Sequence, residues 1–220
     1  MRYSMSKYKR IFEENIGRVE SLKALYIAMK DNNQRDTSNY RLTDLLRAAV
    51  VFLHSAFEEY FRNVLIEWLP IRASSDTLKQ IPITTNAGKK PEKLYLSDLA
   101  NFRNVTCAEI IQESVSAELK LKSFNSENDI RSWCNKLGFS LEECKAIKEI
   151  DAAVHRRHKI VHEADCKERN GEEKERLSSI KPADLTAWIA AYKELVALIE
   201  SHVIDWEKEN QNIPDSPLTL

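Results

Sequence analysis

The feature that most constrains the fold is a long stretch without glycine or proline, which runs from Tyr40 to Trp68. It follows a polar segment, has a candidate N-cap at Thr43 and Asp44, and stops just before Pro70, which predicts one long helix. Apolar residues recur at helical spacing over an unusually wide stripe. This helix is therefore expected to lie centrally, with neighbours on two sides.

Similar periodicity predicts further helices along the chain. They are expected over residues 7–30, about 106–122, about 127–137 and 181–209. Another long helix is expected after the stop at Gly138, where Ser140 and Glu143 match a capping box. Between the second and third helices, residues 70–97 hold three of the six prolines and predict a connection with a short helix in its first half. The charged segment 166–179 is expected to be partly helical.

Composition agrees with an all-α protein, because 43% of residues are hydrophobic, 30% are charged, and only four are glycine. We expect a single-domain bundle of four to five long helices over residues 1–209. An irregular insertion is expected at 71–96 after the second helix, and a loose tail at 210–220. No repeat or domain linker is evident in a chain of 220 residues.

Charge and cysteine content limit the function classes. The 33 basic residues almost balance the 34 acidic ones, so a polyanion would be bound by a local patch and not by a global field. The four cysteines form no CxxC pair, which favours reduced thiols in a cytosolic protein. We find no secretory signal and no apolar run of about 18 residues, so we expect a cytoplasmic protein without membrane contact.

The segment HRRHKIVHEAD, residues 155–165, holds three of the five histidines. On a helix, with about 100° per residue, His155, His158 and His162 lie on one side, so a metal site is one interpretation. Against it, Lys159 stands where a zincin helix carries its glutamate, and neighbouring cations would oppose a bound metal. We therefore expect no metal and no cofactor. A second interpretation is a solvated cationic face near the helix C-terminus.

The third interpretation is RNA cleavage without a metal. An arginine is a permanently charged fork suited to a phosphate, and a histidine can accept and return a proton near neutral pH. Arg157 and His162 are five positions apart, or about 140° around an ideal helix. One helix cannot easily bring both to one phosphate, but a second copy of the helix in a two-fold dimer would supply the missing partner.

These residues resemble a known family. RHKIVH, residues 157–162, is similar to the R-x4-6-H signature of the HEPN superfamily, with His158 as the polar residue after the arginine. In the long second helix, HSAFEEYFRNVL resembles the first motif helix of the prokaryotic RiboL-PSP/MAE-type HEPN groups. Glu58 takes the place of that motif's glutamate. Arg156 also satisfies the signature at the longer spacing, so both arginines remain candidates.

The resemblance implies a helical bundle, a homodimer with a composite cleft, and a metal-independent endoribonuclease. His162 would then be the acid/base and Arg157 the phosphate-binding group, with Glu58, His158 and Arg156 in support. Such proteins act as toxins of toxin-antitoxin pairs or as antiviral effectors, which implies an RNA substrate and an antitoxin or defence-complex partner. The alternative is a non-catalytic helical module that binds RNA or protein within a larger complex.

Overall fold

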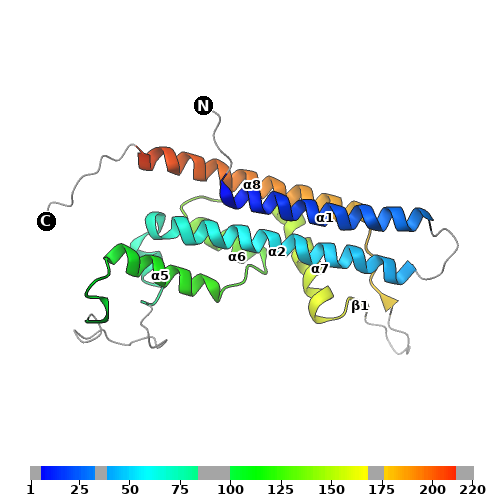
Figure 1. Ribbon diagram of the computed structural model, residues 1–220, viewed down its shortest axis with the longest axis horizontal. Coiled ribbons are helices and arrows are strands. Elements are labelled where there is room, and N and C mark those ends of the chain that lie inside the picture. Colours follow the sequence, from blue (N-terminus) through cyan, green and yellow to red (C-terminus); the bar gives the residue numbers. More distant parts are fainter. Residues whose placement is uncertain (1–5, 33–38, 84–99, 168–175, 212–220) are drawn as a thin grey trace. The chain divides into compact units, whose positions relative to one another are not determined.

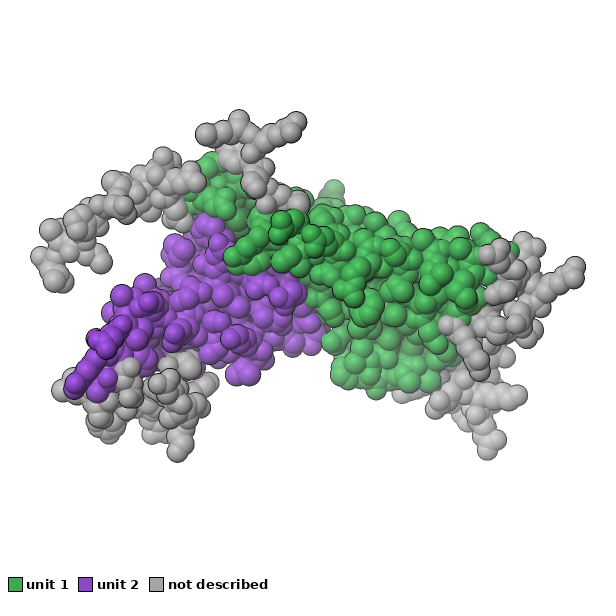
Figure 2. Space-filling view, viewed as in Figure 1, with its two compact units in different colours: residues 1–57, 144–220 green, residues 58–143 purple. Residues whose placement is uncertain are grey.

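The computed structural model describes residues 6–32, 39–83, 100–167 and 176–211. Its chain divides into two compact units, drawn in different colours in Figure 2. The first unit comprises residues 1–57 and 144–220, and the second comprises residues 58–143. The long helix α2 (Asn39–Arg72) contributes its first half to the first unit and its second half to the second unit.

Three further helices and a small hairpin complete the first unit. They are α1 (Lys7–Asn32), α7 (Ile147–His162) and α8 (Pro182–Gln211). Helix α8 packs against both α1 and α7, and α1 runs beside α8 in Figure 1. Directly after α7, the strands β1 (Cys166–Lys167) and β2 (Arg176–Leu177) pair antiparallel, with Cys166 opposite Leu177.

The core of the first unit gathers around Tyr192 of α8, which is fully buried. Its ring lies 5.1 Å from that of Phe57, and its hydroxyl is 2.9 Å from Nδ1 of His54. His54 is 1% exposed and is therefore a core histidine with a hydrogen-bond partner, as its apolar sequence context indicates. Further buried apolar side chains come from all four helices: Phe12, Ile16, Val19, Leu46, Val50, Leu53, Ile147, Ile150, Val154, Leu185, Leu195 and Ile199.

The second unit contains the rest of α2 and several shorter elements. These are α3 (Ser75–Leu78), the 3-10 turn η1 (Ala100–Phe102), α5 (Cys107–Lys120) and α6 (Glu127–Lys136). Phe124, which is fully buried, packs edge-on against Phe61 with ring centroids 4.9 Å apart. The Arg62 guanidinium donates to the carbonyl oxygens of Leu119 and Lys122, at 3.2 and 3.0 Å, and so fixes the end of α5.

The expected all-α bundle is confirmed, apart from the two short strands. The four tryptophans are buried: Trp68, Trp133, Trp188 and Trp206. Within the described residues, no helix is both long enough and apolar enough to cross a membrane.

The expected end of the second helix was wrong, because α2 continues through Pro70 to Arg72. A proline inside a helix lacks the N–H that would bond the carbonyl four residues earlier, here that of Ile66. The side chain of Gln112 donates to the Ile66 carbonyl oxygen at 2.9 Å and satisfies it instead. The helix therefore tolerates this proline close to its C-terminal end.

Two other expectations were also wrong. The helix that carries the histidines begins at Ile147, and Ser140 forms no capping box, because its hydroxyl accepts from the N–H of Glu142 in a local turn. The ends of segment 166–179, expected to be partly helical, form the hairpin strands instead. The expectation for residues 168–175, and that of a loose tail over 212–220, lie outside the described residues.

We predict that Phe57→Ala lowers the free energy of unfolding by about 3–5 kcal/mol, since it removes a buried ring from beside Tyr192. Urea denaturation followed by circular dichroism measures the change. Phe52→Ala on the same helix is the matched control, because Phe52 is 44% exposed. Equal losses for the two variants would contradict the assignment of Phe57 to the core.

Candidate functional site at the end of α7

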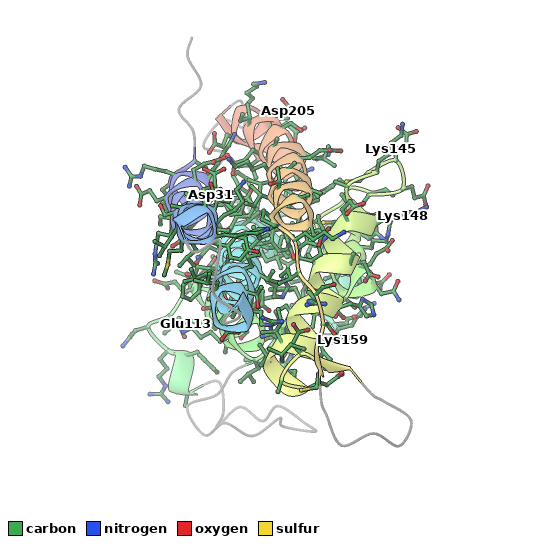
Figure 3. The ribbon with its side chains drawn as sticks, turned by 90° about the vertical axis from the view of Figure 1, so that its right-hand side faces the viewer. Asp31, Glu113, Lys145, Lys148, Lys159 and Asp205 are labelled. Atoms are coloured by element: carbon green, nitrogen blue, oxygen red, sulfur yellow. The ribbon has the colours of Figure 1, made fainter. Side chains whose placement is uncertain are left out.

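The last two turns of α7 carry all the candidate residues of the histidine segment. His155, His158 and His162 are exposed, whereas Arg156 and Arg157 are partly buried. Figure 3 looks onto this part of the ribbon, with Lys159 labelled near the end of the helix. The helix thus presents its imidazoles to solvent and directs its two adjacent guanidinium groups closer to the protein.

The three histidines do not behave as one set. The rings of His158 and His162 lie 4.7 Å apart, and Nε2 of His158 is 3.8 Å from a carboxylate oxygen of Glu163. His155 instead directs its Nδ1 to the backbone and side-chain oxygens of Asp151, at 3.0 and 3.3 Å. Among the described residues, no three His, Cys, Asp or Glu side chains gather in a way that would hold a metal ion.

Arg156 belongs to a buried ion cluster. Its Nη2 lies 2.7 Å from Oδ2 of Asp165 and 2.9 Å from the carbonyl oxygen of Ser178. Asp165 is 1% exposed. Burial lowers the pKa of Arg156, Asp165 raises it, and the nearby Arg47 lowers it again. An arginine remains protonated in a protein, so the guanidinium stays a cation held by the carboxylate.

The same carboxylate holds a second arginine, from α2. Nε of Arg47 donates to Oδ2 of Asp165 at 2.7 Å, and its Nη2 donates to the Ser178 carbonyl oxygen at 2.9 Å. Nη1 of Arg47 donates hydrogen bonds to the side-chain oxygens of Thr43 and Asp44 on its own helix. The fork of Arg47 therefore reaches α2, the turn after α7 and the residue after β2 at once, which a lysine could not do.

The turn that delivers Asp165 to this cluster has an uncommon backbone. Ala164 and Asp165 both adopt positive φ, 49° and 57°. This left-handed conformation costs an ordinary residue about 1–2 kcal/mol, though aspartate tolerates it better than most. Two consecutive residues of this kind persist only where the surrounding contacts hold them, and the two arginines on Asp165 supply such contacts.

Arg157 differs from its neighbour. Its Nε is buried, and Arg157 makes no hydrogen bond or ion pair with any residue that the structure describes. Its guanidinium is therefore not held by another described residue, whereas that of Arg156 is engaged by Asp165 and Ser178. Both arginines satisfy the sequence signature, but Arg156 has hydrogen-bond partners within the protein and Arg157 has none among the described residues.

Glu58 lies in the second unit, on α2. Its Oε1 accepts a hydrogen bond from the backbone N–H of Phe124 at 3.0 Å. That bond gives a partner to a backbone N–H just after α5, at the residue whose ring packs against Phe61. The contact gives Glu58 a role in holding the second unit together, whereas Arg157 and His162 belong to the first unit.

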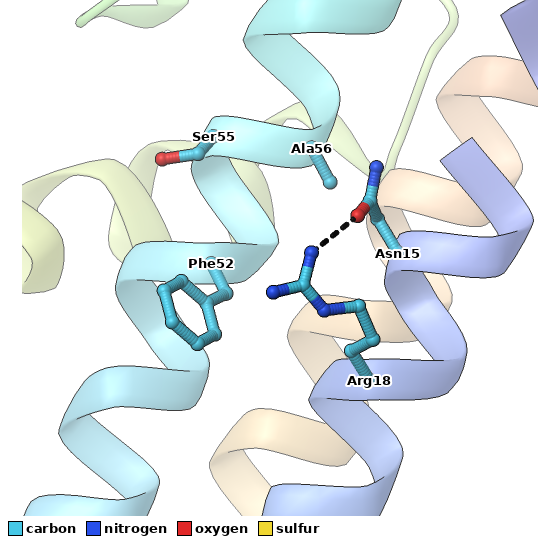
Figure 4. Close-up of a pocket in the computed structure, with 5 residues that line it drawn as sticks. All are labelled: Asn15, Arg18, Phe52, Ser55 and Ala56. Carbon is cyan, nitrogen blue, oxygen red and sulfur yellow. Dashed lines mark hydrogen bonds between the residues drawn. The ribbon is translucent and has the colours of Figure 1, made fainter. Parts of the chain in front are cut away.

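A surface pocket elsewhere in the first unit contains none of the candidate residues. It is lined by Asn15, Arg18, Phe52, Ser55 and Ala56 from α1 and α2. Arg18 donates to Oδ1 of Asn15 at 3.1 Å and lies over the ring of Phe52, 5.5 Å from its centroid (Figure 4). The cation is thus already engaged, and the pocket offers no pair of groups for acid/base chemistry.

Sequence reasoning missed Arg47 and Asp165. A signal for Arg47 was present, since it is a charged residue beside the apolar stripe of a helix predicted to be central. A buried charge at such a position requires a partner. The partner lies 118 positions away, and a single sequence does not identify a pair so distant.

We predict that Arg156→Gln lowers stability and that Arg157→Gln leaves it almost unchanged. Arg156→Gln removes an ion pair from a buried carboxylate and should lower the free energy of unfolding by about 2–4 kcal/mol. Arg157→Gln removes a buried Nε that has no partner, so the change should stay within about 0.5 kcal/mol. Thermal unfolding of both purified variants measures the difference. A larger loss for Arg157→Gln would overturn the distinction between them.

Comparison with protein families gives one match that spans most of the chain. The model of the RiboL-PSP-HEPN family matches residues 13–205. A comparison with curated proteins finds no match, and neither does a comparison with solved structures. The family match includes α2, the ion cluster and the whole of α7, and it agrees with the resemblance of the RHKIVH segment. This chain belongs to the RiboL-PSP-HEPN family.

Proposed function

We propose that this protein is a metal-independent endoribonuclease in which Arg157 and His162 act on the RNA. Membership of the RiboL-PSP-HEPN family supports an RNase-like or nucleotide-binding module. The nuclease activity itself is our inference from the residues at the end of α7. No cofactor enters the proposed reaction.

The observation that carries the proposal is the contrast between two adjacent arginines. Arg156 is engaged by Asp165 and Ser178, while Arg157 has no partner among the described residues. A partly buried guanidinium without a counter-ion is costly to keep unless it binds something negative. A phosphodiester fits this requirement, because a guanidinium fork matches two phosphate oxygens.

The chemistry needs one proton carrier and one anion stabiliser. The ribose 2′-oxygen attacks the adjacent phosphorus and forms a new O–P bond, while His162 accepts the hydroxyl proton. The bond from phosphorus to the 5′-oxygen breaks, and His162 returns a proton to that leaving oxygen. Arg157 stabilises the charge that builds on the phosphoryl oxygens. The products are a 2′,3′-cyclic phosphate and a 5′-hydroxyl.

Helix geometry supports a dimer as the active form. Arg157 and His162 are five positions apart on α7, which separates them by about 140° around the helix. A two-fold homodimer would set His162 of one copy against Arg157 of the other, so that each pair forms one composite site. The exposed position of His162 leaves it accessible to such a partner.

The other candidate residues take supporting roles in this proposal. His158, whose ring is 4.7 Å from that of His162, would tune the histidine or contact the scissile phosphate. Arg156 would act through the ion cluster, and Glu58 would act within the second unit, where it accepts from the Phe124 N–H. We also propose that residues 1–209 form one domain with an insertion at 71–96 and a tail at 210–220, where α2 ends at Arg72 inside the insertion and α8 ends at Gln211 inside the tail. The single family match across both units supports this organisation.

We further propose a biological setting. An RNA-cleaving enzyme harms the cell that makes it unless a partner restrains it, so a toxin of a toxin-antitoxin pair or an antiviral effector fits best. The proposed location is the cytoplasm, where RNA is found. An antitoxin or a defence-complex subunit would be the second partner, after the RNA.

We predict that the purified protein cuts transfer or total RNA in the presence of EDTA. His162→Ala should lower kcat by about 10²–10⁴-fold, because general acid–base catalysis contributes about that much. Arg157→Ala should lower it by about 10²–10³-fold, as does loss of a group that stabilises a transition-state anion. Gel analysis of labelled RNA, with identification of the product ends, measures both effects.

His155→Ala is the control, since the same helix face carries this histidine and Asp151 already binds it. It should leave the rate within about twofold. If wild type and His162→Ala both leave RNA intact but bind it, the chain is a binding module and the nuclease proposal fails. Cleavage that EDTA abolishes would point to a metal-dependent reaction instead.

A further inference from the structure

His162 occupies the weakest position of its helix. It is the last residue of α7, and the last carbonyl groups of a helix have no partner within it, so helix ends fray unless something holds them. The ring of His162 is exposed, and its described ring contact is with His158 on the same helix. The direction of its imidazole therefore depends on how firmly the final turn is closed.

The turn after His162 closes that end. The carbonyl oxygen of Lys159 accepts from the N–H of Glu163 at 3.0 Å and from the N–H of Asp165 at 2.9 Å. The second bond forms only because Ala164 and Asp165 adopt positive φ and turn the chain back over the helix end. Neither residue is a glycine, so their own preferences do not explain this conformation.

The buried ion cluster explains it. Arg47 and Arg156 both reach Oδ2 of Asp165 at 2.7 Å, and the backbone oxygen of Asp165 accepts from the N–H of Ser178 at 2.8 Å. Asp165 is held by its side chain and by both backbone polar groups. Three elements outside the final turn of α7 thus take part: α2, the body of α7 itself and the chain after β2.

We propose that Asp165 is a positioning residue that fixes the end of α7 and thereby the orientation of His162. The inference rests on the proposed function of His162 and Arg157 and adds to it the group that holds their helix turn in place. Asp165 is 1% exposed and both cluster arginines bind it, so it acts through the backbone and not on the RNA.

The buried ion cluster around Asp165 would influence the geometry of a composite site. His162 must reach across to a phosphate that the other copy's arginine holds, and displacement of a reacting group by about 1 Å can cost about 100-fold in rate. Arg156 is the residue before Arg157, so the same cluster also anchors the helix turn that carries the phosphate-binding group. Loosening Asp165 would affect both partners of the reaction.

Asp165→Asn is the test, because it preserves shape and a hydrogen-bond acceptor while removing the charge that two arginines share. In the purified full chain with ¹³C-labelled histidine rings, we expect the His162 ring signal to shift or broaden. We expect the signals of His54 and His202, on other helices, to stay in place. Hydrogen exchange at the amides of residues 163 and 165 should speed up about tenfold or more. With RNA, kcat should fall about 10–100-fold while KM changes by less than about threefold.

Two further variants provide a second test and a control. Arg47→Lys keeps the charge on α2 but loses the fork that spans Asp165 and Ser178, so it should give the same changes to a smaller extent. It serves as the test if Asp165→Asn does not fold. The matched control is Asp76→Asn, which breaks an exposed ion pair with Lys79 at the end of α3 and should change none of the readouts.

The outcomes distinguish a failure of the positioning role of Asp165 from a failure of the proposed ribonuclease activity. If the His162 signal, the amide exchange and kcat stay unchanged in Asp165→Asn while only the melting temperature falls, the cluster is merely stabilising and the inference is overturned. If wild type cuts no RNA, the proposed function fails, but the ring signals and the amide exchange still test whether Asp165 orients His162.

Discussion

The structure of the candidate site depends on one buried carboxylate, that of Asp165. Two guanidinium groups converge on the same oxygen of this residue, and both also donate to the Ser178 carbonyl oxygen. Burying such charges is expensive, so a cluster of this kind contributes little net stability compared with apolar residues of the same volume. Its effect is on position, since a buried charge tolerates few arrangements of its partners.

The cluster also divides two adjacent arginines between two tasks. Arg156 completes the cluster with Asp165, and Arg157 is left without a partner among the described residues. Neighbours on a helix point in directions about 100° apart, so one can face the protein while the next stays available. In our proposal the first sets the helix in place and the second binds the phosphate, with His162 five residues further along.

Much of the fold was predictable from periodicity, because α1, α2 and α8 carry long apolar stripes at helical spacing. The local exceptions were not, since each depends on a contact that the sequence does not display. Helix α2 passes through Pro70 because Gln112 satisfies the freed carbonyl of Ile66. The positive φ values at Ala164 and Asp165 likewise depend on arginines that lie elsewhere in the chain. Arg157 and His162 were found from their spacing, but their environments required the structure.

The central claim is that Arg157 of one subunit and His162 of another cut RNA together. Mixing purified Arg157→Ala and His162→Ala subunits, after their dimers have been dissociated and reassembled, tests it most directly. Random pairing makes about half of the dimers mixed, each with one intact composite site, so the account predicts about a quarter of the wild-type cleavage rate. A mixture as inactive as either variant alone would contradict the shared site.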